Sequence, residues 1–346
     1  MSEFPAWLQG ARAAPSVYNT QPWRFALRPN GDILVRWDPE RVLPAADPMG
    51  RDLYLSLGAA IESARLRSAA AGQPLAFTLA TDDEEGVVGV LTRVAEPDDR
   101  SDLRLAQALW ERRTARTRHL RFPVPPVVLL ALRRETVGWG CRLHIITERP
   151  DIRRLAWLTR IATAHSFRRV EVVEELFHWL RLDSEDPAYE RDGLTAESLE
   201  LWRVSRILMR WSSTHDPSFW PVRIAVQELY ALQLLLIARQ TASACLLTTA
   251  STDRSDMVNA GRLLLRLWLL GAEAGMNAHP LARVISDDAT TARCLELFNA
   301  PGTIPAALFR LGFCPPVATS ARLPLDELVE QPGRVSQTVA TNRRPG

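Results

Sequence analysis

The spacing of apolar and polar residues predicts a short helix and a hairpin at the start of the chain. Apolar positions with a helical period cover residues 4–14 and stop at the Pro15-Ser16 break. Residues 22–27 and 33–37 have the pattern of strands. Asn30-Gly31 lies between them and is a strong signal for a tight turn, so we expect a β-hairpin here.

A long helical pattern then covers residues 50–71, and Gly72 is expected to end it as a C-terminal cap. Strand-like runs follow around residues 75–80 and 87–94. The acidic, polar stretch 97–102 is the candidate linker. It divides the chain into a first part, residues 1–100, and a second part, residues 101–346.

Helices and strands also alternate in the second part. Residues 151–240 have an almost wholly helical pattern, with breaks near 183–193 and 212–221. The alternation of the two element types over the whole chain predicts an α+β fold. The other expected helices cover residues 103–113, 126–134 and 255–275, and the other expected strands cover 142–147, 242–250 and 306–313.

Two long helical segments share an internal pattern. Gly58 and Gly72 are 14 positions apart in the first part, and Gly261 and Gly275 are 14 apart in the second. The inner glycine of each pair permits close helix packing, and the outer one ends the helix. Two matched pairs can arise by chance. However, each helix lies at a similar point of its part and follows strand-like sequence, which indicates two related halves.

Composition and charge narrow the class of protein. With 47% hydrophobic and 24% charged residues among 346, the chain is an ordinary globular protein of about two domains. Its net charge of +2 gives no reason to expect nucleic acid or an anionic membrane as a partner. The sequence lacks a secretory signal, a membrane-spanning stretch and metal-ligand spacing of its four cysteines. We therefore expect a cytoplasmic protein without a bound metal.

The first segment with candidate chemistry is residues 13–25, Ala-Ala-Pro-Ser-Val-Tyr-Asn-Thr-Gln-Pro-Trp-Arg-Phe. The side chains of Ser16 and Asn19 can hydrogen-bond the edge of a flat polar ring, while Pro15 and Trp23 pack. An ordinary polar loop before a strand is the alternative.

The second segment is residues 112–116, Arg-Arg-Thr-Ala-Arg. Arginines with a hydroxyl between them can bind the oxygens of a phosphomonoester through charge-assisted hydrogen bonds. The alternative is a solvated basic helix end, which is common in a chain whose 42 basic residues are all Arg.

These two segments resemble motifs of the FMN-dependent nitroreductases. The first is similar to their APSxxNxQPW stretch, and the second to their RRSxR motif, with Thr114 in place of Ser. Residues 38–39 and 47–60 further resemble the Acg-type subgroup of fused, nitroreductase-like proteins. The resemblance implies a nitroreductase-like fold in two degenerate halves. It also implies that residues of both motifs bind FMN: Pro15, Ser16 and Asn19 at the flavin ring, and Arg112, Arg113, Thr114 and Arg116 at the phosphate and ribityl chain.

Two later segments complete the resemblance. The turn at residues 276–282, in which Pro280 and Leu281 are candidate cofactor-binding residues, is expected to present backbone N–H groups to the flavin, although Ala282 stands where the family often has an acidic residue. His279 is a candidate proton donor, but a lone histidine is more often a surface or packing residue. Near the C-terminus, Arg322 matches one of two basic positions in the family, and Ser320 stands at the other.

Residues 165–240 have no counterpart in minimal nitroreductases. This helical insert contains four tryptophans, which either anchor a packed helical core or form a lid over the flavin: Trp179, Trp202, Trp211 and Trp220.

The resemblance implies an FMN-dependent oxidoreductase that uses NADH or NADPH as electron donor and reduces or oxidises a small organic molecule. An FMN-storage protein without turnover and a specialised biosynthetic flavoenzyme are the alternatives. No acid or base is assigned as catalytic, because the flavin carries out the hydride chemistry. A fused chain could function as a monomer.

Overall fold

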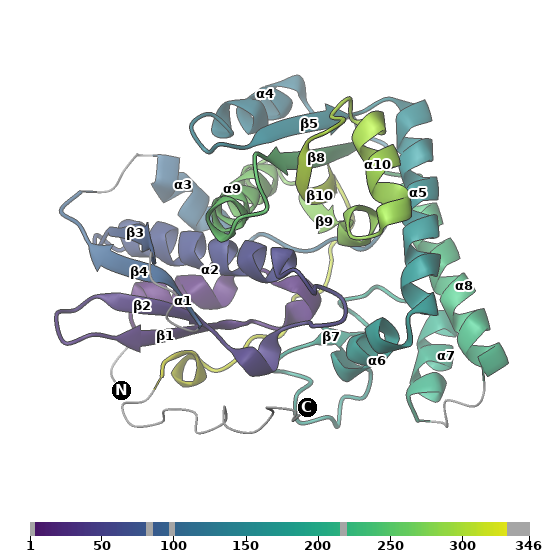
Figure 1. Ribbon diagram of the computed structural model, residues 1–346, viewed down its shortest axis with the longest axis horizontal. Helices are drawn as coiled ribbons and strands as arrows, with labels where there is room; N and C mark the ends of the chain where they lie inside the picture. The colour runs from purple at the N-terminus through teal and green to yellow at the C-terminus, as the bar shows by residue number, and fades with distance from the viewer. Residues whose placement is uncertain (1–3, 81–85, 97–100, 215–219, 331–346) are drawn as a thin grey trace, which may run out of the picture.

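The computed structural model describes residues 4–80, 86–96, 101–214 and 220–330. It contains two four-stranded antiparallel sheets, in the orders β1-β2-β4-β3 and β5-β8-β10-β9. Helices α2 and α9 pack on each other between the sheets (Figure 1). The protein therefore has an α+β fold. The strands are β1 Trp23–Leu27, β2 Ile33–Trp37, β3 Leu75–Leu79, β4 Val87–Arg93, β5 Arg142–Ile146, β8 Ser243–Thr249, β9 Asn277–Pro280 and β10 Ile304–Gly312.

The predicted hairpin and both long helices are confirmed. β1 and β2 pair antiparallel from Trp23–Trp37 to Leu27–Ile33, and Gly31 in the turn has a φ of 89°. The two long helices end before Gly72 and Gly275, whose φ angles are 72° and 74°. The helices outside the insert are α1 Ala6–Ala13, α2 Arg51–Ala70, α3 Ser101–Ala108, α4 Pro126–Glu135, α9 Arg254–Glu273 and α10 Asp288–Leu297.

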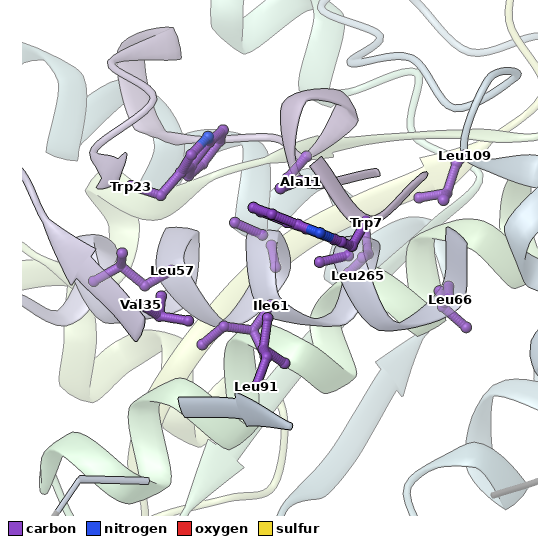
Figure 2. Close-up of a cluster of buried hydrophobic side chains, with 14 of the residues drawn as sticks. Trp7, Ala11, Trp23, Val35, Leu57, Ile61, Leu66, Leu91, Leu109 and Leu265 are labelled. Atoms are coloured by element: carbon purple, nitrogen blue, oxygen red, sulfur yellow. The ribbon is translucent and has the colours of Figure 1, made fainter. Parts of the chain in front are cut away.

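Large apolar side chains fill the space between the first sheet and the helices. Trp7 of α1 and Phe25 of β1 meet edge to face, with ring centroids 5.2 Å apart. Figure 2 shows Trp7 and Ile61 close to Leu265, which comes from α9 in the second part of the chain. The core of the first sheet is therefore completed by the second part.

A buried ion cluster crosses the same helix pair. The carboxylate of Glu62 in α2 is fully buried and binds Arg65 on its own helix at 3.0 Å. It also binds Arg262 and Arg266 of α9, at 3.0 and 2.9 Å. The contact between the two parts is thus both apolar and ionic.

Two predicted elements are wrong, and one helix was missed. The expected helix 103–113 ends at Ala108, because residues 109–111 form a turn and Thr114 then forms a parallel bridge with Ala278 of β9. The expected turn 276–282 contains strand β9, which pairs with β10. Helix α10 was not predicted. Residues 97–100 of the candidate linker lie outside the described residues, and residues 101–102 begin α3.

The insert forms a helical layer at one side of the molecule (Figure 1). Its first predicted break, near residues 183–193, is confirmed, while residues 215–219 of the second lie outside the described residues. Among the described residues, no helix has the length and apolar character to cross a bilayer. The elements of the insert and the helix leading into it are α5 Arg149–Arg168, α6 Val170–His178, β6 Leu180–Arg181, β7 Leu194–Thr195, α7 Arg203–Thr214 and α8 Trp220–Ala238.

After β10 the chain returns to the first sheet. Val329 forms a parallel bridge with Phe25 of β1, and the N–H of Glu330 donates to the carbonyl of Phe25 at 2.8 Å. Figure 1 shows this yellow segment beside the purple strands. The last described residues therefore lie beside β1, at the end of the first candidate motif, residues 13–25.

Candidate functional site

The loop between α1 and β1 has an unusual backbone. Tyr18, Asn19 and Gln21 have φ angles of 47°, 57° and 52°, in the left-handed region that non-glycine residues rarely adopt. The hydroxyl of Ser16 accepts a hydrogen bond from the N–H of Gln21 at 2.9 Å and closes the loop. Such conformations cost energy, persist only where surrounding contacts fix them, and cluster at binding sites.

The C-terminal segment supplies those contacts. Asn19 binds it in both directions: its Nδ2 donates to the carbonyl of Ala321 at 3.0 Å, and its Oδ1 accepts from Nη1 of Arg322 at 2.9 Å. The N–H of Leu323 donates to Oε1 of Gln21 at 2.9 Å. The structure thus brings together Asn19 and Arg322, two predicted site residues that are 303 positions apart.

Arg112 reaches the same place from the second part of the chain. Its Nη2 and that of Arg322 both donate to the carbonyl of Ala13, at 3.3 and 3.4 Å. The guanidinium of Arg112 also lies over the ring of Trp268, 4.8 Å from its centroid. Two positive groups from distant segments therefore share one acceptor at the end of α1.

No carboxylate balances these two charges among the described residues. Arg112 is only 5% exposed. Its Nε and Nη1, and Nε of Arg322, are buried without a hydrogen-bond partner. Buried unpaired cations are costly, so this pair is suited to a bound anion with several oxygens.

The pKa values of both guanidiniums are lowered, which reflects the same cost of burying a positive charge. Burial, with Arg322 and Arg113 nearby, lowers the pKa of Arg112 to about 9. Burial, with Arg12 and Arg113 nearby, lowers the pKa of Arg322 to about 10. Both groups remain protonated at neutral pH, and an anion would relieve their mutual repulsion.

The rest of the 112–116 motif lies along the edge of the second sheet. The N–H of Arg113 donates to Oδ1 of Asn277 at 3.0 Å, and Thr114 bridges Ala278. The side chain of Arg116 turns toward the insert, where its Nη1 donates to the carbonyl of Ser198 at 2.7 Å. Arg116 is half-buried, because the insert covers part of the side chain.

The Pro280-Leu281 segment is more regular than expected. Pro280 ends β9 opposite Phe309, and the N–H of Leu281 donates to the carbonyl of Leu308 at 2.7 Å. The Leu281 N–H is therefore used within the protein in this conformation, and does not point to a ligand. Pro280 itself has no N–H.

His279 is a packing residue. It is buried, and its Nδ1 accepts a hydrogen bond from Nε of Arg310 at 3.1 Å. Burial, reinforced by Arg310, holds the pKa of His279 well below its usual value. The ring is therefore neutral near pH 7, and it does not act as a proton donor through Nδ1.

Sequence reasoning did not predict the role of Arg310. This fully buried residue of β10 donates through Nη2 to the carbonyl of Ala115 at 2.8 Å, and also to that of Thr117. It thereby fixes the backbone that follows Arg112. The Arg-Leu-Gly sequence at residues 310–312, within the expected strand 306–313, did not show what the arginine binds.

The insert is tied to the first part of the chain. Glu175 of α6 accepts hydrogen bonds from the N–H groups of Ala45 and Ala46, at 2.9 and 2.8 Å. Asp192 binds Arg41 at 3.0 Å. Gln21, in the left-handed loop, donates to the carbonyl of Arg191 at 2.9 Å. The insert therefore touches the loop that carries Ser16 and Asn19.

The insert tryptophans serve different roles. Trp179 is buried, with the guanidiniums of Arg41 and Arg181 each 5.8 Å from its ring centroid. Trp202 is 40% exposed, so it is not a core anchor. The side chains of Trp211 and Trp220 are outside the described part of the structure.

Comparison with known proteins gives relatives that span nearly the whole chain. One is provisionally named NAD(P)H nitroreductase Rv3131, from Mycobacterium tuberculosis strain H37Rv. It is 28% identical over 336 residues, which cover 92% of this chain and 88% of the relative. Another, from the same strain, is provisionally named NAD(P)H nitroreductase acg. It is 25% identical over 334 residues and 93% of both chains. No protein-family model matches the chain.

Solved structures of flavoproteins also match part of the chain. One is the FMN-dependent nitroreductase NfnB from Mycobacterium smegmatis in complex with NADPH, which is 16% identical and has a TM-score of 0.40. The match covers 69% of this chain and all of the other.

By sequence, the chain is similar over nearly its whole length to a class of proteins named as NAD(P)H nitroreductases. Within that class its similarity is to the Acg-type proteins, as the motifs at residues 13–25 and 47–60 predict.

Proposed function

We propose that the protein binds FMN, with the flavin phosphate between Arg112 and Arg322. A phosphomonoester carries about −1.5 to −2 charges near pH 7 and has several acceptor oxygens. The observation that supports the proposal is the set of buried, unpartnered guanidinium nitrogens on these two residues. A phosphate would supply both the missing counter-charge and the missing acceptors.

The flavin ring is assigned to the strained loop. Pro15, Ser16 and Asn19 lie next to the anion site, because Asn19 hydrogen-bonds Arg322 directly. Arg113, Thr114 and Arg116 are assigned to the phosphate and ribityl chain. Arg116 lies four residues beyond Arg112, at most about 14 Å away along an extended backbone. Pro280 and Leu281 stay as predicted neighbours of the ring, without a hydrogen bond from Leu281.

The function that fits this site best is oxidoreduction. NADH or NADPH would supply electrons, and a small organic molecule would be the second substrate. When bound, FMN supplies hydride transfer at its N5 atom, while the chain provides anchoring and orientation. The names of the relatives support an NAD(P)H-dependent activity of nitroreductase type. The division at residue 100, the monomeric state and the cytoplasmic location stay predictions.

One observation favours a second candidate, FMN storage. The insert contacts the ring-binding loop and is held by Glu175, Asp192 and the carbonyl of Arg191. A segment fastened in this way could cover the flavin and prevent turnover. A biosynthetic flavoenzyme with one dedicated substrate is the remaining alternative.

Two measurements test the proposal. The purified or reconstituted protein should be yellow, and the released flavin should be FMN; FAD or no flavin would refute the assignment. Rapid mixing with NADH or NADPH then separates the candidates. An enzyme should lose the oxidised-flavin absorbance within seconds and recover it with a nitroarene or quinone. A storage protein should respond only to dithionite.

A further inference from the structure

Besides Arg112 and Arg322, a third arginine near the proposed ring site has no carboxylate partner among the described residues. Arg283 follows β9 in the short helix η3, Ala282–Ile285, and its Nη2 donates to the hydroxyl of Tyr18 at 3.3 Å. Its Nη1 is buried without a hydrogen-bond partner. Within the described residues Arg283 has no ion pair. Asp287, four residues further along, instead contacts Nδ1 of His165 at 3.1 Å.

Tyr18 adds a second donor beside Arg283. It belongs to the strained loop and lies between Ser16 and Asn19, the residues assigned to the flavin ring. Burial raises the pKa of Tyr18 in spite of the opposing charge of Arg283, so the phenol stays protonated at neutral pH. Its oxygen accepts from Arg283, which leaves its own hydrogen to donate. In the part of the chain that the structure describes, no protein acceptor takes that hydrogen.

The surroundings of this pair are aromatic. The guanidinium of Arg283 lies 5.1 Å from the ring centroid of Phe167, and Phe167 meets Tyr230 edge to face, with centroids 5.9 Å apart. Tyr18 packs against the same apolar cluster of the insert. Two polar donors thus lie against aromatic side chains, an arrangement that suits a flat molecule with one anionic end.

We propose that Arg283 and Tyr18 bind the carboxylate of a small aromatic substrate. The Nη1 of Arg283 and the hydroxyl of Tyr18 would each donate to the carboxylate, and the aromatic side chains of the insert would contact its ring. The inference rests on the proposed function, because it places this carboxylate beside the loop assigned to the flavin. It names the substrate class: aromatic acids rather than their neutral analogues.

The test uses benzoate as a redox-inert probe. Isothermal titration calorimetry on the whole flavin-loaded protein should show benzoate binding and weaker binding of benzamide. Arg283→Gln should weaken benzoate binding at least ten-fold, and Tyr18→Phe by a smaller factor, with FMN content unchanged. Arg293→Gln, at an exposed position on α10, is the matched control and should bind benzoate like the unmodified protein.

Turnover gives a second readout. For Arg283→Gln, the KM for 4-nitrobenzoate should rise at least ten-fold while kcat changes little, and the constants for nitrobenzene should stay the same. If Arg283 had a purely structural role, the substitution would instead change the kinetic constants for both 4-nitrobenzoate and nitrobenzene. Should Arg283→Gln fail to fold, Tyr18→Phe, which keeps the ring, carries the comparison.

The outcomes for the two proposals are separable. Protein that binds no flavin refutes the proposed function, and benzoate calorimetry on that protein still tests Arg283. If the flavin-loaded protein does not bind benzoate, the carboxylate site alone is overturned. The same holds if the Arg283→Gln variant binds benzoate with unchanged affinity. If Arg283→Gln weakens the binding of NADPH but leaves the affinity for benzoate intact, the carboxylate site is also overturned.

Discussion

Gly58 of α2 and Gly261 of α9 are reciprocal contact points. A Cβ on Gly58 would lie 2.1 Å from the carbonyl oxygen of Val258, and one on Gly261 would lie 2.2 Å from that of Leu55. Each glycine thus admits the backbone of the other helix. Because the two residues also hold matching places in the internal sequence pattern, this contact has the form of a two-fold interface contained within one chain.

Gly58→Ala should destabilise the protein by about 3 kcal/mol, at the upper end of the range for overpacking, because the new methyl group meets rigid backbone. Urea unfolding measures this change. Gly271→Ala, on the partner helix α9, is the control. Its Cβ would meet only the end of the Leu311 side chain, at 2.7 Å. A similar loss in both variants would contradict the argument from close helix approach.

Glu62 should make the free energy of unfolding depend on pH in the acidic range. Burial alone would raise its pKa, but Arg262, Arg65 and Arg266 hold it at about 2, below the reference value of 4.5. The folded pKa is the lower one, so its contribution is complete above pH 4.5 and is lost as the pH falls toward 2. That contribution is about 3 kcal/mol in order of magnitude. Unfolding free energies at pH 6 and pH 3.5 should differ by about 1.4 kcal/mol from this group, a little under half of its contribution, because the rest is lost between pH 3.5 and about 2.

The matched variant for this titration is Glu62→Gln. It should be less stable than the unmodified protein at pH 6, because it leaves buried arginines without their carboxylate. It should also lose less stability between pH 6 and pH 3.5. An unchanged pH dependence in Glu62→Gln would show that other carboxylates cause the acid sensitivity.

The parts of the fold that depend on local sequence could be predicted. The Asn30-Gly31 hairpin and the ends of the long helices at Gly72 and Gly275 follow from which residues tolerate a positive φ. Strand β9 could not be predicted in this way. Its four residues, Asn277–Pro280, include a proline and are a strand because β10 pairs with them.

The candidate site was predictable only in part, for the same reason. The motifs identified Asn19, Arg112 and Arg322, but not their meeting at the carbonyl of Ala13. The 112–116 motif suggested that its arginines form one phosphate-binding cluster. The segment is extended, however, so Arg116 reaches the insert at Ser198 while Arg112 faces Arg322. Contacts between segments far apart in the chain have no local signature in one sequence.

Arg322→Ala should weaken FMN binding by about 2–3 kcal/mol, the scale of a hydrogen bond to a charged group. We expect Arg112→Ala to act similarly and Arg116→Ala less strongly, because Arg116 already donates to Ser198. Titration of the apoprotein with FMN, followed by flavin fluorescence, gives the affinities. Arg154→Ala on α5, where the side chain is 73% exposed, is the control. Equal affinity in Arg322→Ala and Arg154→Ala would remove the anion pair from the FMN site.

Glu175→Ala tests whether the insert restricts access to the flavin. The change removes the acceptor of two backbone N–H groups, those of Ala45 and Ala46, and should loosen α6 from the first part of the chain. If the insert limits turnover, reduction of the flavin by NAD(P)H should become faster. Stopped-flow absorbance measures the rate. The exposed neighbour Glu174, changed to Ala, is the control and should leave the rate unaltered.

The two parts of the chain should provide one FMN site between them. In the first part, the connection from α1 to β1 carries Ser16 and Asn19. In the second part, the connection from α4 to β5 is residues 136–141, Thr-Val-Gly-Trp-Gly-Cys, and has no such motif. The ring-binding loop is therefore present once.

The distribution of arginines also indicates a single FMN site. The arginines at the α2–α9 contact, Arg65, Arg262 and Arg266, bind Glu62 and so cannot serve a second phosphate. A second FMN would bring about two negative charges into a partly buried place without matched cations, which is unfavourable. The fully reconstituted protein should therefore contain one FMN per chain. Flavin absorbance after denaturation, divided by protein from amino-acid analysis, gives the ratio. A ratio near two would show that the second half keeps a working site, and would contradict the division of motifs argued here from Asn19, Arg112 and Arg322.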